Sequence, residues 1–468
     1  EFIEALERSG DVVRIQREVD WDLEAAAIAG RVCELRSPAP FFERIKGCAE
    51  GRILGAPIAT FRRLAVALGL DPSTPPRELH AEYERRIEQP IKPVMVKDGP
   101  CQERAMLGDE IDLYRLPAPM VHDGDGGRYI GTWHLMVSRD PDTGWTNWGM
   151  YRLMIHNRTN LVGLLEPFQH LGMVLYSKYI PKGEPMPVAV VLGADQLCCL
   201  VAATSFQIGE DEVDYAGALR QEPVELVKCQ TNDLLVPAHA EVVIEGEILP
   251  DRLLPEGPFG EYPGYRTHGA ALMPAIRVTA ITYRSHPINC MSVEGVGVPD
   301  SRIGPSLTGA VQIKRRLRRH EIAVTDVYIP PEMSNLVAVV GVRSGQSDVA
   351  SRVMDVLHGR RALLPKIVVV DEDIDVFDLG EVMHAFATRC HPLRGTVARA
   401  DRQGWTLAPY SSPQEREQHK LATAVYDCTW PADWSKESDI PVRMSFEQAY
   451  PQAIRRQVLE EWKSYGFQ

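Results

Sequence analysis

The chain has 468 residues and a net charge of −13, with 51 basic against 64 acidic side chains. This acidic balance, with no basic run, argues against a nucleic-acid-binding surface. The 44% hydrophobic and 25% charged content is typical of a globular protein with a large core, and the length suggests about three domains.

The first hundred residues predict a small α/β unit. Residues 2–8 have helical spacing, 12–15 are strand-like, and an alanine-rich helix is expected from Asp22 towards Arg36, with Asp22 as a candidate N-cap. The proline-containing stretch 90–100 is typical of a linker. We therefore predict an N-terminal domain over residues 1–105.

Strands dominate the next part of the chain. Short apolar runs separated by Pro, Gly and Asp turns predict strands, and two segments have helical patterns, 212–220 and 307–319. The expected strands are 133–137, 161–165, 188–192, 241–248 and 275–283. The pattern predicts a mainly antiparallel barrel or sandwich over residues 106–310, a fold that can hold a flat ligand at its mouth.

Strands and helices alternate over residues 311–468, which predicts a mostly parallel sheet in a C-terminal α/β domain. The expected order is strand 336–342, helix 347–358, strand 366–370 and helix 379–389. Residues 445–465 predict one long amphipathic helix, whose simplest role is packing on its own domain.

The nine cysteines are scattered and contain no Cys-x-x-Cys pair, which argues against a disulfide framework or a thiolate metal site. We expect buried thiols in a reducing, cytoplasmic environment. No apolar run approaches the roughly 20 residues that a membrane helix needs, and no membrane association is expected.

Two carboxylates, Glu256 and Glu261, lie in the run Pro255–Tyr265. Its glycines and prolines are unsuited to a helix or a central strand, so the run predicts a stiff loop that presents both acids. An ordinary surface turn with two solvated glutamates is the alternative.

A second run, Trp145–Met154, places Arg152 among apolar and aromatic residues. Such an arginine either extends outward to solvent or is buried against a carboxylate.

The two runs together resemble the UbiD family of decarboxylases, which use prenylated flavin mononucleotide (FMN). The family is marked by a segment such as Asn-x-Gly-x-Tyr-Arg, here 147–152, and by a later Glu-Gly-Pro-Phe-Gly-Glu loop, here 256–261. The resemblance extends over almost the whole chain. It implies a UbiD-like multidomain fold, α+β and α/β: an N-terminal α/β unit, a split β-barrel that binds the flavin, and a C-terminal α/β domain whose last helix helps to form a homodimer or larger assembly.

By this resemblance, the family's Glu-Arg-Glu network falls on Glu256, Arg152 and Glu261, with Glu261 as the proton donor. Burial near a second carboxylate raises a carboxyl pKa, and a neighbouring arginine opposes that rise, so the balance sets the working state. The alternative is a buried ion-pair cluster that only stabilises the barrel.

The resemblance also implies a divalent metal, Mn²⁺ or Mg²⁺, held by Asn147, His170 and Glu212 against the flavin phosphate. It implies a monovalent cation, K⁺ or Na⁺, near Trp148 and Ser205. Further cofactor contacts fall on Thr132, Met150, Tyr151, Arg152, Gln169 and Lys366; a solvated lysine at a strand start is an equal reading of Lys366.

Arg302 is a candidate for holding a second acidic or polar substituent of the substrate, if it points inward; the alternative is a surface arginine on a loop. The segments around Leu393-Arg394 and Tyr410–Ser412 are also candidates to approach the site from the C-terminal domain.

The sequence therefore predicts a reversible, non-oxidative decarboxylase, a carboxy-lyase, acting on an aromatic, heteroaromatic or α,β-unsaturated carboxylic acid. A separate flavin prenyltransferase would supply its cofactor. A flavin-dependent reductase or oxidase, a metal-dependent hydrolase that uses Asn147, His170 and Glu212, and a non-catalytic subunit of a carboxylase complex are the alternatives.

Overall fold

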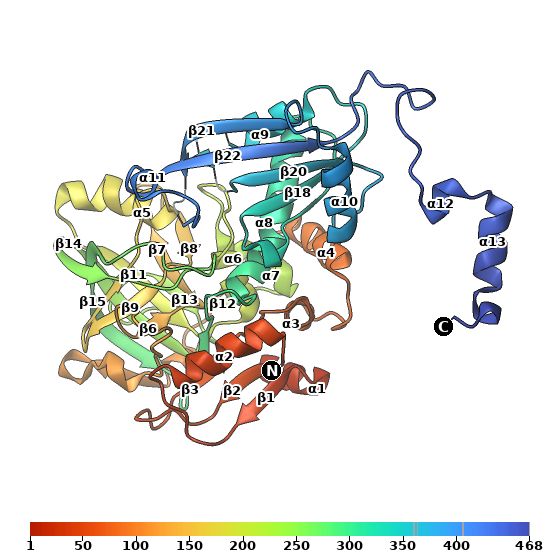
Figure 1. Ribbon diagram of the computed structural model, residues 1–468. Coiled ribbons are helices and arrows are strands. Elements are labelled where there is room, and N and C mark those ends of the chain that lie inside the picture. The colour runs from red at the N-terminus through yellow and green to blue at the C-terminus, as the bar shows by residue number, and fades with distance from the viewer. Residues whose placement is uncertain (359–360, 363, 405–406, 468) are drawn as a thin grey trace.

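The structure is a computed structural model that describes residues 1–358, 361–362, 364–404 and 407–467, arranged around three main sheets (Figure 1). The N-terminal sheet has the order β1-β2-β3-β16, with parallel outer pairs and an antiparallel pair at its centre. Its elements are α1 (Phe2–Ser9), β1 (Val12–Ile15), α2 (Glu24–Leu35), β2 (Ala39–Phe42), β3 (Arg52–Gly55), α3 (Phe61–Ala67), α4 (Pro76–Ile87) and β16 (Ile288–Met291).

The predicted N-cap of α2 is wrong. The helix begins at Glu24, and Leu23 occupies the cap position with a positive φ of 68°. The backbone N–H of Asp22 donates to the Asp20 carboxylate, while the Glu24 carboxylate accepts from the Asp20 N–H. The entry to the helix is therefore stabilised by a local turn rather than by a capping side chain.

The central sheet contains nine strands and curls into a half-barrel, as predicted. The order is β6-β9-β10-β15-β14-β11-β7-β8, β5 also pairs with β15, and every pairing is antiparallel. The strands are β5 (Arg104–Leu107), β6 (Tyr129–Gly131), β7 (His134–Arg139), β8 (Thr146–Gly149), β9 (Leu153–Asn157), β10 (Asn160–Gly163), β11 (Met186–Leu192), β14 (Val242–Glu256) and β15 (Ala271–Tyr283).

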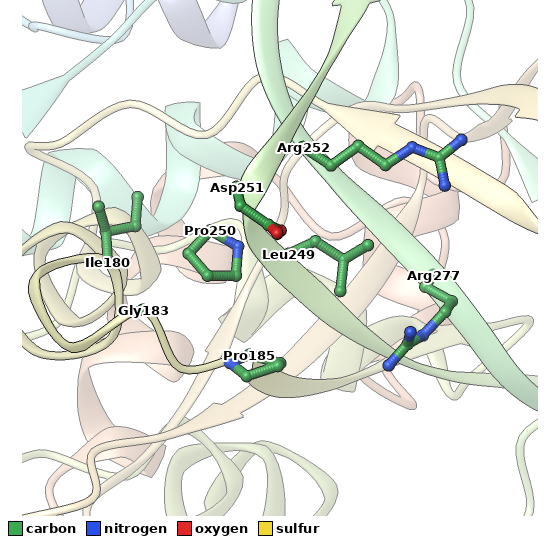
Figure 2. A pocket seen from close by; sticks show the side chains of 8 residues that line it. All are labelled: Ile180, Gly183, Pro185, Leu249, Pro250, Asp251, Arg252 and Arg277. Carbon is green, nitrogen blue, oxygen red and sulfur yellow. The ribbon is translucent and has the colours of Figure 1, made fainter.

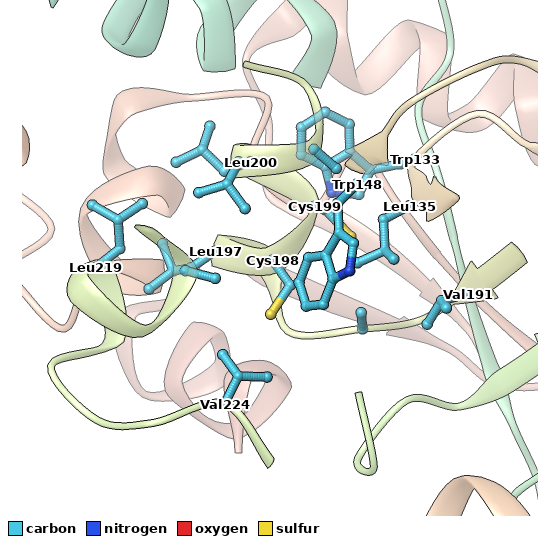
Figure 3. Packing of buried hydrophobic residues seen from close by; sticks show 14 of the residues in the cluster. Trp133, Leu135, Trp148, Val191, Leu197, Cys198, Cys199, Leu200, Leu219 and Val224 are labelled. Carbon is cyan, nitrogen blue, oxygen red and sulfur yellow. The ribbon is translucent and has the colours of Figure 1, made fainter. Parts of the chain in front are cut away.

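Helices and a small sheet cover this half-barrel. They are α5 (His170–Val174), α6 (Gln196–Ala202), α7 (Glu212–Arg220), β4 (Val94–Met95), β12 (Glu225–Lys228) and β13 (Leu235–Pro237). Because β4 pairs in parallel with β12, the segment predicted as a linker is fixed to the central unit. Figure 3 shows the core here: Trp148 of β8 and Trp133, just before β7, pack with Cys198 and Cys199 of α6.

All nine cysteines are free thiols and eight of them are buried, as the sequence predicts. Burial raises the pKa of several, Cys199 among them, which keeps them in the neutral thiol form.

The C-terminal sheet has the order β17-β18-β20-β22-β21-β19. Strands β18, β20 and β22 run parallel, with antiparallel neighbours β17 and β21 on either side. Its elements are β17 (Val324–Tyr328), β18 (Val337–Val342), α9 (Val349–Leu357), β19 (Arg361–Ala362), β20 (Lys366–Asp371), α10 (Leu379–Arg389), β21 (Thr396–Gly404), α11 (Pro413–Glu417) and β22 (Lys420–Cys428). The predicted strand and helix alternation is confirmed.

Helix α8 (Asp300–Arg319) lies between β16 of the N-terminal sheet and β17 of the C-terminal sheet, and it begins earlier than the predicted Leu307. Pro305 lies inside it and has no N–H to donate to the carbonyl of Ser301. The side chain of Asn335, from the turn before β18, donates to that carbonyl at 2.8 Å instead. A bond from the C-terminal unit thus replaces the missing bond of the helix.

The predicted single helix over 445–465 is wrong. The chain forms α12 (Phe446–Ala449), α13 (Gln452–Glu460) and the short turn η7 (Trp462–Tyr465), with a break at Tyr450-Pro451. Tyr450 is extended, as expected for a residue before proline. This tail stands away from the body of the protein in Figure 1, and none of its helical residues is buried.

Short helical turns complete the described chain: η1 (Pro100–Gln102), η2 (Gly108–Glu110), η3 (Leu113–Arg115), η4 (Leu175–Tyr179), η5 (Ile180–Lys182) and η6 (Pro331–Met333). Within the described residues, every helix is too short or too polar to cross a membrane.

Candidate active site

Arg152 and Glu256 form a two-point ion pair inside the half-barrel. Arg152 lies between β8 and β9, and Glu256 is the last residue of β14, paired opposite Ala271. The Nε and Nη2 atoms of Arg152 donate to the two carboxylate oxygens of Glu256 at 2.8 and 2.7 Å. Glu256 was predicted to lie in the loop; it instead ends a paired strand, so its backbone is fixed by the sheet.

Glu261 is the third member of this group. Its Oε1 forms an ion pair with Nη1 of Arg152, so the guanidinium contacts both acids, as the sequence predicts. Glu256 is completely buried, whereas Glu261 is 8% exposed. Of the two carboxylates, only Glu261 therefore keeps some access to the outside.

The predicted loop is held by several hydrogen bonds. It connects β14 to β15 over residues 257–270, and Glu261 takes part in its turn through two backbone hydrogen bonds. The Glu261 N–H donates to the Tyr265 carbonyl at 3.1 Å, and its carbonyl accepts from the Gly264 N–H at 2.8 Å. From the C-terminal unit, Arg416 donates to the carbonyl of Thr267 at 3.1 Å.

Two aromatic residues that sequence reasoning did not single out complete the group. The Tyr129 hydroxyl donates to Oε1 of Glu256 at 3.0 Å, and the ring of Phe259 lies 5.1 Å from the Arg152 guanidinium. Burial and the charge of Glu256 raise the pKa of Tyr129, so it stays a hydrogen-bond donor. Phe259 lies inside the Glu-Gly-Pro-Phe-Gly-Glu run, so the sequence could have indicated its place beside Arg152. No sequence pattern indicated Tyr129.

Asn147, His170 and Glu212 converge from three elements: β8, the start of α5 and the start of α7. Nδ1 of His170 lies 3.9 Å from Oε1 of Glu212, whose other oxygen accepts from the Trp148 N–H at 2.9 Å. Burial raises the pKa of Glu212, although the contacts with His170 and the Trp148 N–H oppose this.

A shared tyrosine links Asn147 to His170. The hydroxyl of Tyr151 accepts from the Asn147 amide at 3.2 Å and from the N–H of Leu171, next to His170, also at 3.2 Å. An amide, an imidazole and a buried carboxylate are a donor set that suits Mn²⁺ or Mg²⁺ and leaves other positions for phosphate and water. The residues therefore fit the implied metal and flavin phosphate.

The other predicted cofactor residues lie in different settings. Thr132 accepts the Ser292 N–H at 3.1 Å, and Gln169, the N-cap residue of α5, accepts the Glu166 N–H at 2.9 Å. Met150 packs at the edge of the Trp148 core, and Ser205 is exposed just after α6. Lys366 begins β20 with its Nζ 4.6 Å from the ring centre of Tyr410.

Arg302 is neither on a loop nor on the surface. It lies in the first turn of α8 and is 1% exposed. Its Nε donates to the Tyr262 carbonyl at 2.8 Å and its Nη1 to the Val296 carbonyl at 3.2 Å; Nη2 also contacts the carbonyls of Tyr262 and Gly295. All of these bonds are to backbone, and two of them hold Tyr262, the residue that follows Glu261.

Two of the hollows on the described surface lie near β14 and the loop that follows it. One of about 560 Å³, shown in Figure 2, lies beside the middle of β14 and is lined by Pro250, Asp251, Arg252 and Arg277 but by none of the predicted site residues. A second of about 640 Å³ lies between α2 and the loop and is lined by Glu261, His122 and Glu294. Because Glu261 lines it, we associate the second hollow with the candidate site.

Comparison with known proteins identifies relatives along the whole chain. The N-terminal, Rift-related and C-terminal domain models of 3-octaprenyl-4-hydroxybenzoate carboxy-lyase match residues 3–83, 92–296 and 306–428. The pyrrole-2-carboxylic acid decarboxylase of Pseudomonas aeruginosa is 35% identical, over 100% of this chain and 97% of that protein. Ferulic acid decarboxylase 1 of Saccharomyces cerevisiae is 31% identical, over 100% and 98%.

A solved structure shows the same fold. The UbiD-class enzyme HmfF of Pelotomaculum thermopropionicum, in complex with FMN, superposes with a TM-score of 0.82 at 28% identity, over 97% of this chain and 98% of that one. An evolved dimeric form of that enzyme was solved with prenylated FMN and gives a TM-score of 0.78 at 28% identity, over 94% of this chain and 96% of that one.

Proposed function

Because this chain belongs to the UbiD family of carboxy-lyases, we propose that it is a prenylated-FMN-dependent decarboxylase in which Glu261 is the proton donor. The observation that carries the proposal is the position of Arg152. A single guanidinium contacts a completely buried acid on one side and a slightly exposed acid on the other. This asymmetry gives the two carboxylates different roles.

Glu256 is the fixed anion of the group. It accepts two hydrogen bonds from Arg152 and one from Tyr129, and it has no contact with solvent. In a buried site, two such charge-assisted bonds hold the guanidinium plane in one orientation. Arg152 is thereby set to orient a substrate carboxylate and to stabilise Glu261 once it is ionised.

When bound, the cofactor supplies an electron sink for the pair released as the C–C bond to the carboxylate breaks, which side chains cannot do. CO₂ leaves, and Glu261 transfers its proton to the carbon that lost it. Arg152 then faces a newly ionised Glu261, so its charge is most stabilising after transfer. The β14–β15 loop and the C-terminal unit exclude water from the reacting carbon.

The metal and cation sites belong to this proposal. Asn147, His170 and Glu212 would hold Mn²⁺ or Mg²⁺ against the flavin phosphate, and the region of Trp148 and Ser205 would hold K⁺ or Na⁺. The buried Glu212 supports the divalent site, because a carboxylate with a raised pKa gains from a neighbouring cation. Thr132, Met150, Tyr151, Gln169 and Lys366 stay predictions as flavin contacts.

The substrate class follows from the relatives. Pyrrole-2-carboxylic acid is heteroaromatic and ferulic acid carries an acrylic acid group, so we propose an aromatic, heteroaromatic or α,β-unsaturated acid. Both types have the carboxyl group on an unsaturated carbon. Arg302 stays a prediction as a substrate residue, and its backbone contacts favour a different role, argued below.

The test is to produce the protein together with a flavin prenyltransferase, release the chromophore, and identify it by absorbance and mass. Elemental analysis of the same sample identifies the metals. We expect prenylated FMN, one divalent metal, and CO₂ release from at least one member of a panel of aryl, pyrrolyl and acrylic acids. Plain FMN that turns over with a nicotinamide would favour the reductase or oxidase instead. Loaded protein with no activity on any acid would favour a non-catalytic subunit.

A further inference from the structure

Asp125 fastens the loop that carries Glu261 on both sides of that residue. Its Oδ1 accepts from the Gly260 N–H at 3.0 Å and from Nη2 of Arg266 at 2.9 Å. Its Oδ2 accepts from the backbone N–H and from Nδ1 of His122, each at 3.0 Å. The Asp125 side chain is completely buried, so these partners determine where it lies.

His122 completes the contact on its other side. Its Nε2 lies 2.7 Å from the backbone carbonyl oxygen of Glu294, in the segment that leads to α8. A carbonyl oxygen can only accept, and so can an ionised carboxylate. Both ring nitrogens of His122 therefore face acceptors, and only the imidazolium has an N–H for each.

The charges around His122 favour that form. Burial lowers its pKa, but the hydrogen bond and charge of Asp125, the Glu294 carbonyl and the Glu294 charge outweigh burial and raise the pKa above its ordinary value. The pKa of Asp125 is lowered, because His122 and Arg266 outweigh its burial. The Glu294 carboxylate accepts from the hydroxyls of Ser292 at 3.1 Å and Ser301 at 2.5 Å rather than from His122.

The contacts form a closed ring around Glu261. Asp125 holds Gly260, which precedes it, and Arg302 holds the carbonyl of Tyr262, which follows it. Arg302 also contacts the carbonyl of Gly295. The backbone carbonyl of the preceding residue, Glu294, contacts His122 and so closes the ring of contacts. The aromatic ring of Phe259 packs beside this set of contacts, with its centre 5.8 Å from the centre of the His122 imidazole. Three separate segments therefore meet at His122.

We propose that His122 is a positioning residue whose imidazolium holds Asp125 and the Glu294 segment together and so keeps Glu261 against Arg152. This inference rests on the proposed role of Glu261 as proton donor. A neutral imidazole has one N–H, so loss of the proton leaves a ring lone pair facing either Asp125 or the Glu294 carbonyl. One of the two His122 hydrogen bonds is then lost, and the β14–β15 loop becomes more mobile.

The first consequence is an alkaline limit to turnover. Because the native contacts raise the pKa of His122, the imidazolium persists below that raised value, and its stabilisation is lost as pH rises through it. We expect kcat to fall there while KM changes little, because the loop positions the acid rather than binding the substrate.

The variant His122→Gln tests this in the loaded enzyme. Gln keeps similar bulk and one donor group but carries no charge, so we expect kcat to fall roughly 10- to 100-fold, with KM and flavin content unchanged and the alkaline limit abolished. Asp125→Asn is expected to act in the same direction. The matched control is His239→Gln, which removes an exposed histidine 2.8 Å from Glu225 and should leave the profile unchanged. A His122→Gln enzyme with the wild-type pH profile would overturn the proposal.

A second measurement does not depend on activity. Nitrogen-15 NMR of histidine-labelled apoprotein distinguishes an imidazolium, with two equivalent N–H signals, from a neutral ring. We expect the His122 signal, assigned by its loss in His122→Gln, to stay in the imidazolium form well above the ordinary histidine pKa range. A neutral His122 at neutral pH would refute the inference without touching the role of Glu261; an inactive enzyme with a protonated His122 would instead count against the decarboxylase.

Discussion

Arg152 carries one positive charge for two carboxylates. With both acids ionised the group has a net charge of −1, and it becomes neutral when one of them holds a proton. Glu256 accepts three hydrogen bonds and has no exposure, whereas Glu261 is 8% exposed, and this difference is the basis for proposing Glu261 as the proton donor.

The variant Glu261→Gln is expected to lower kcat by about 10²- to 10⁴-fold, the usual contribution of a general acid, because an amide cannot donate the proton. Flavin content and thermal stability should stay close to wild type, since Gln retains an oxygen for Arg152. Single-turnover decarboxylation measured by CO₂ release checks the rate.

The control for this variant is Glu247→Gln, which alters an ion pair with Arg277 on the outside of β14, where both side chains are partly exposed. It is expected to leave kcat unchanged, because exposed pairs contribute little. Full activity of Glu261→Gln would contradict the assignment of the donor.

At the scale of elements, the β14–β15 loop keeps its shape because a glycine packs against it. Gly126 donates its N–H to the Pro258 carbonyl at 2.7 Å. A Cβ on Gly126 would lie 2.1 Å from the carbonyl oxygen of Gly257 and 2.5 Å from its carbon, both backbone atoms. No side chain fits there without moving the loop.

We therefore expect Gly126→Ala to displace the loop and lower kcat roughly 10- to 100-fold, with a lower melting temperature. Gly269→Ala is the matched control: Gly269 lies in the β14–β15 loop itself, is exposed like Gly126, and its added Cβ would meet no atom within 4 Å. Equal effects of the two substitutions would show that the close contact at Gly126 is unimportant. Steady-state kinetics and a thermal melt distinguish these results.

The sequence predicted most elements and the convergence of Arg152, Glu256 and Glu261, because local periodicity and the two runs carry that information. The predictions were wrong or incomplete where contacts between residues far apart in the sequence determine the structure. The predicted helix began at Leu307, yet α8 begins at Asp300 and continues through Pro305, where Asn335 donates to the carbonyl of Ser301. The ring at His122 was missed for the same reason, since Asp125, Gly260 and Glu294 are far apart in the chain.

At the scale of the whole molecule, the C-terminal tail exposes apolar side chains that a solvated monomer has no reason to keep. Ile454 is 47% exposed, Leu459 62% and Trp462 42%. Exposed apolar groups of this kind mark interaction surfaces. We propose that the tail packs on a second copy of the chain, in line with the homodimer expected from the sequence.

A variant that ends at Ile440 is expected to run as a monomer under conditions in which the full chain is a dimer or larger, as measured by light scattering after gel filtration. Ile454→Asp should weaken association, whereas Glu460→Gln, on the same helix, should not. A full-length chain that is already monomeric, or a truncated chain that keeps its assembly, would exclude the tail as the interface.

Helix α8 connects the loop that carries Glu261 to the C-terminal unit. Its first turn carries Arg302, which grips the carbonyl beside Glu261, and its last turns are fixed to the C-terminal unit, where Lys314 pairs with Asp326 of β17 at 3.2 Å. At 1.5 Å per residue, Arg302 lies about 26 Å from the C-terminal end of this 20-residue helix, so a tilt of about three degrees about that end moves Arg302 by about 1.3 Å. A small rotation of the C-terminal unit would therefore displace the loop that carries Glu261, the proposed proton donor.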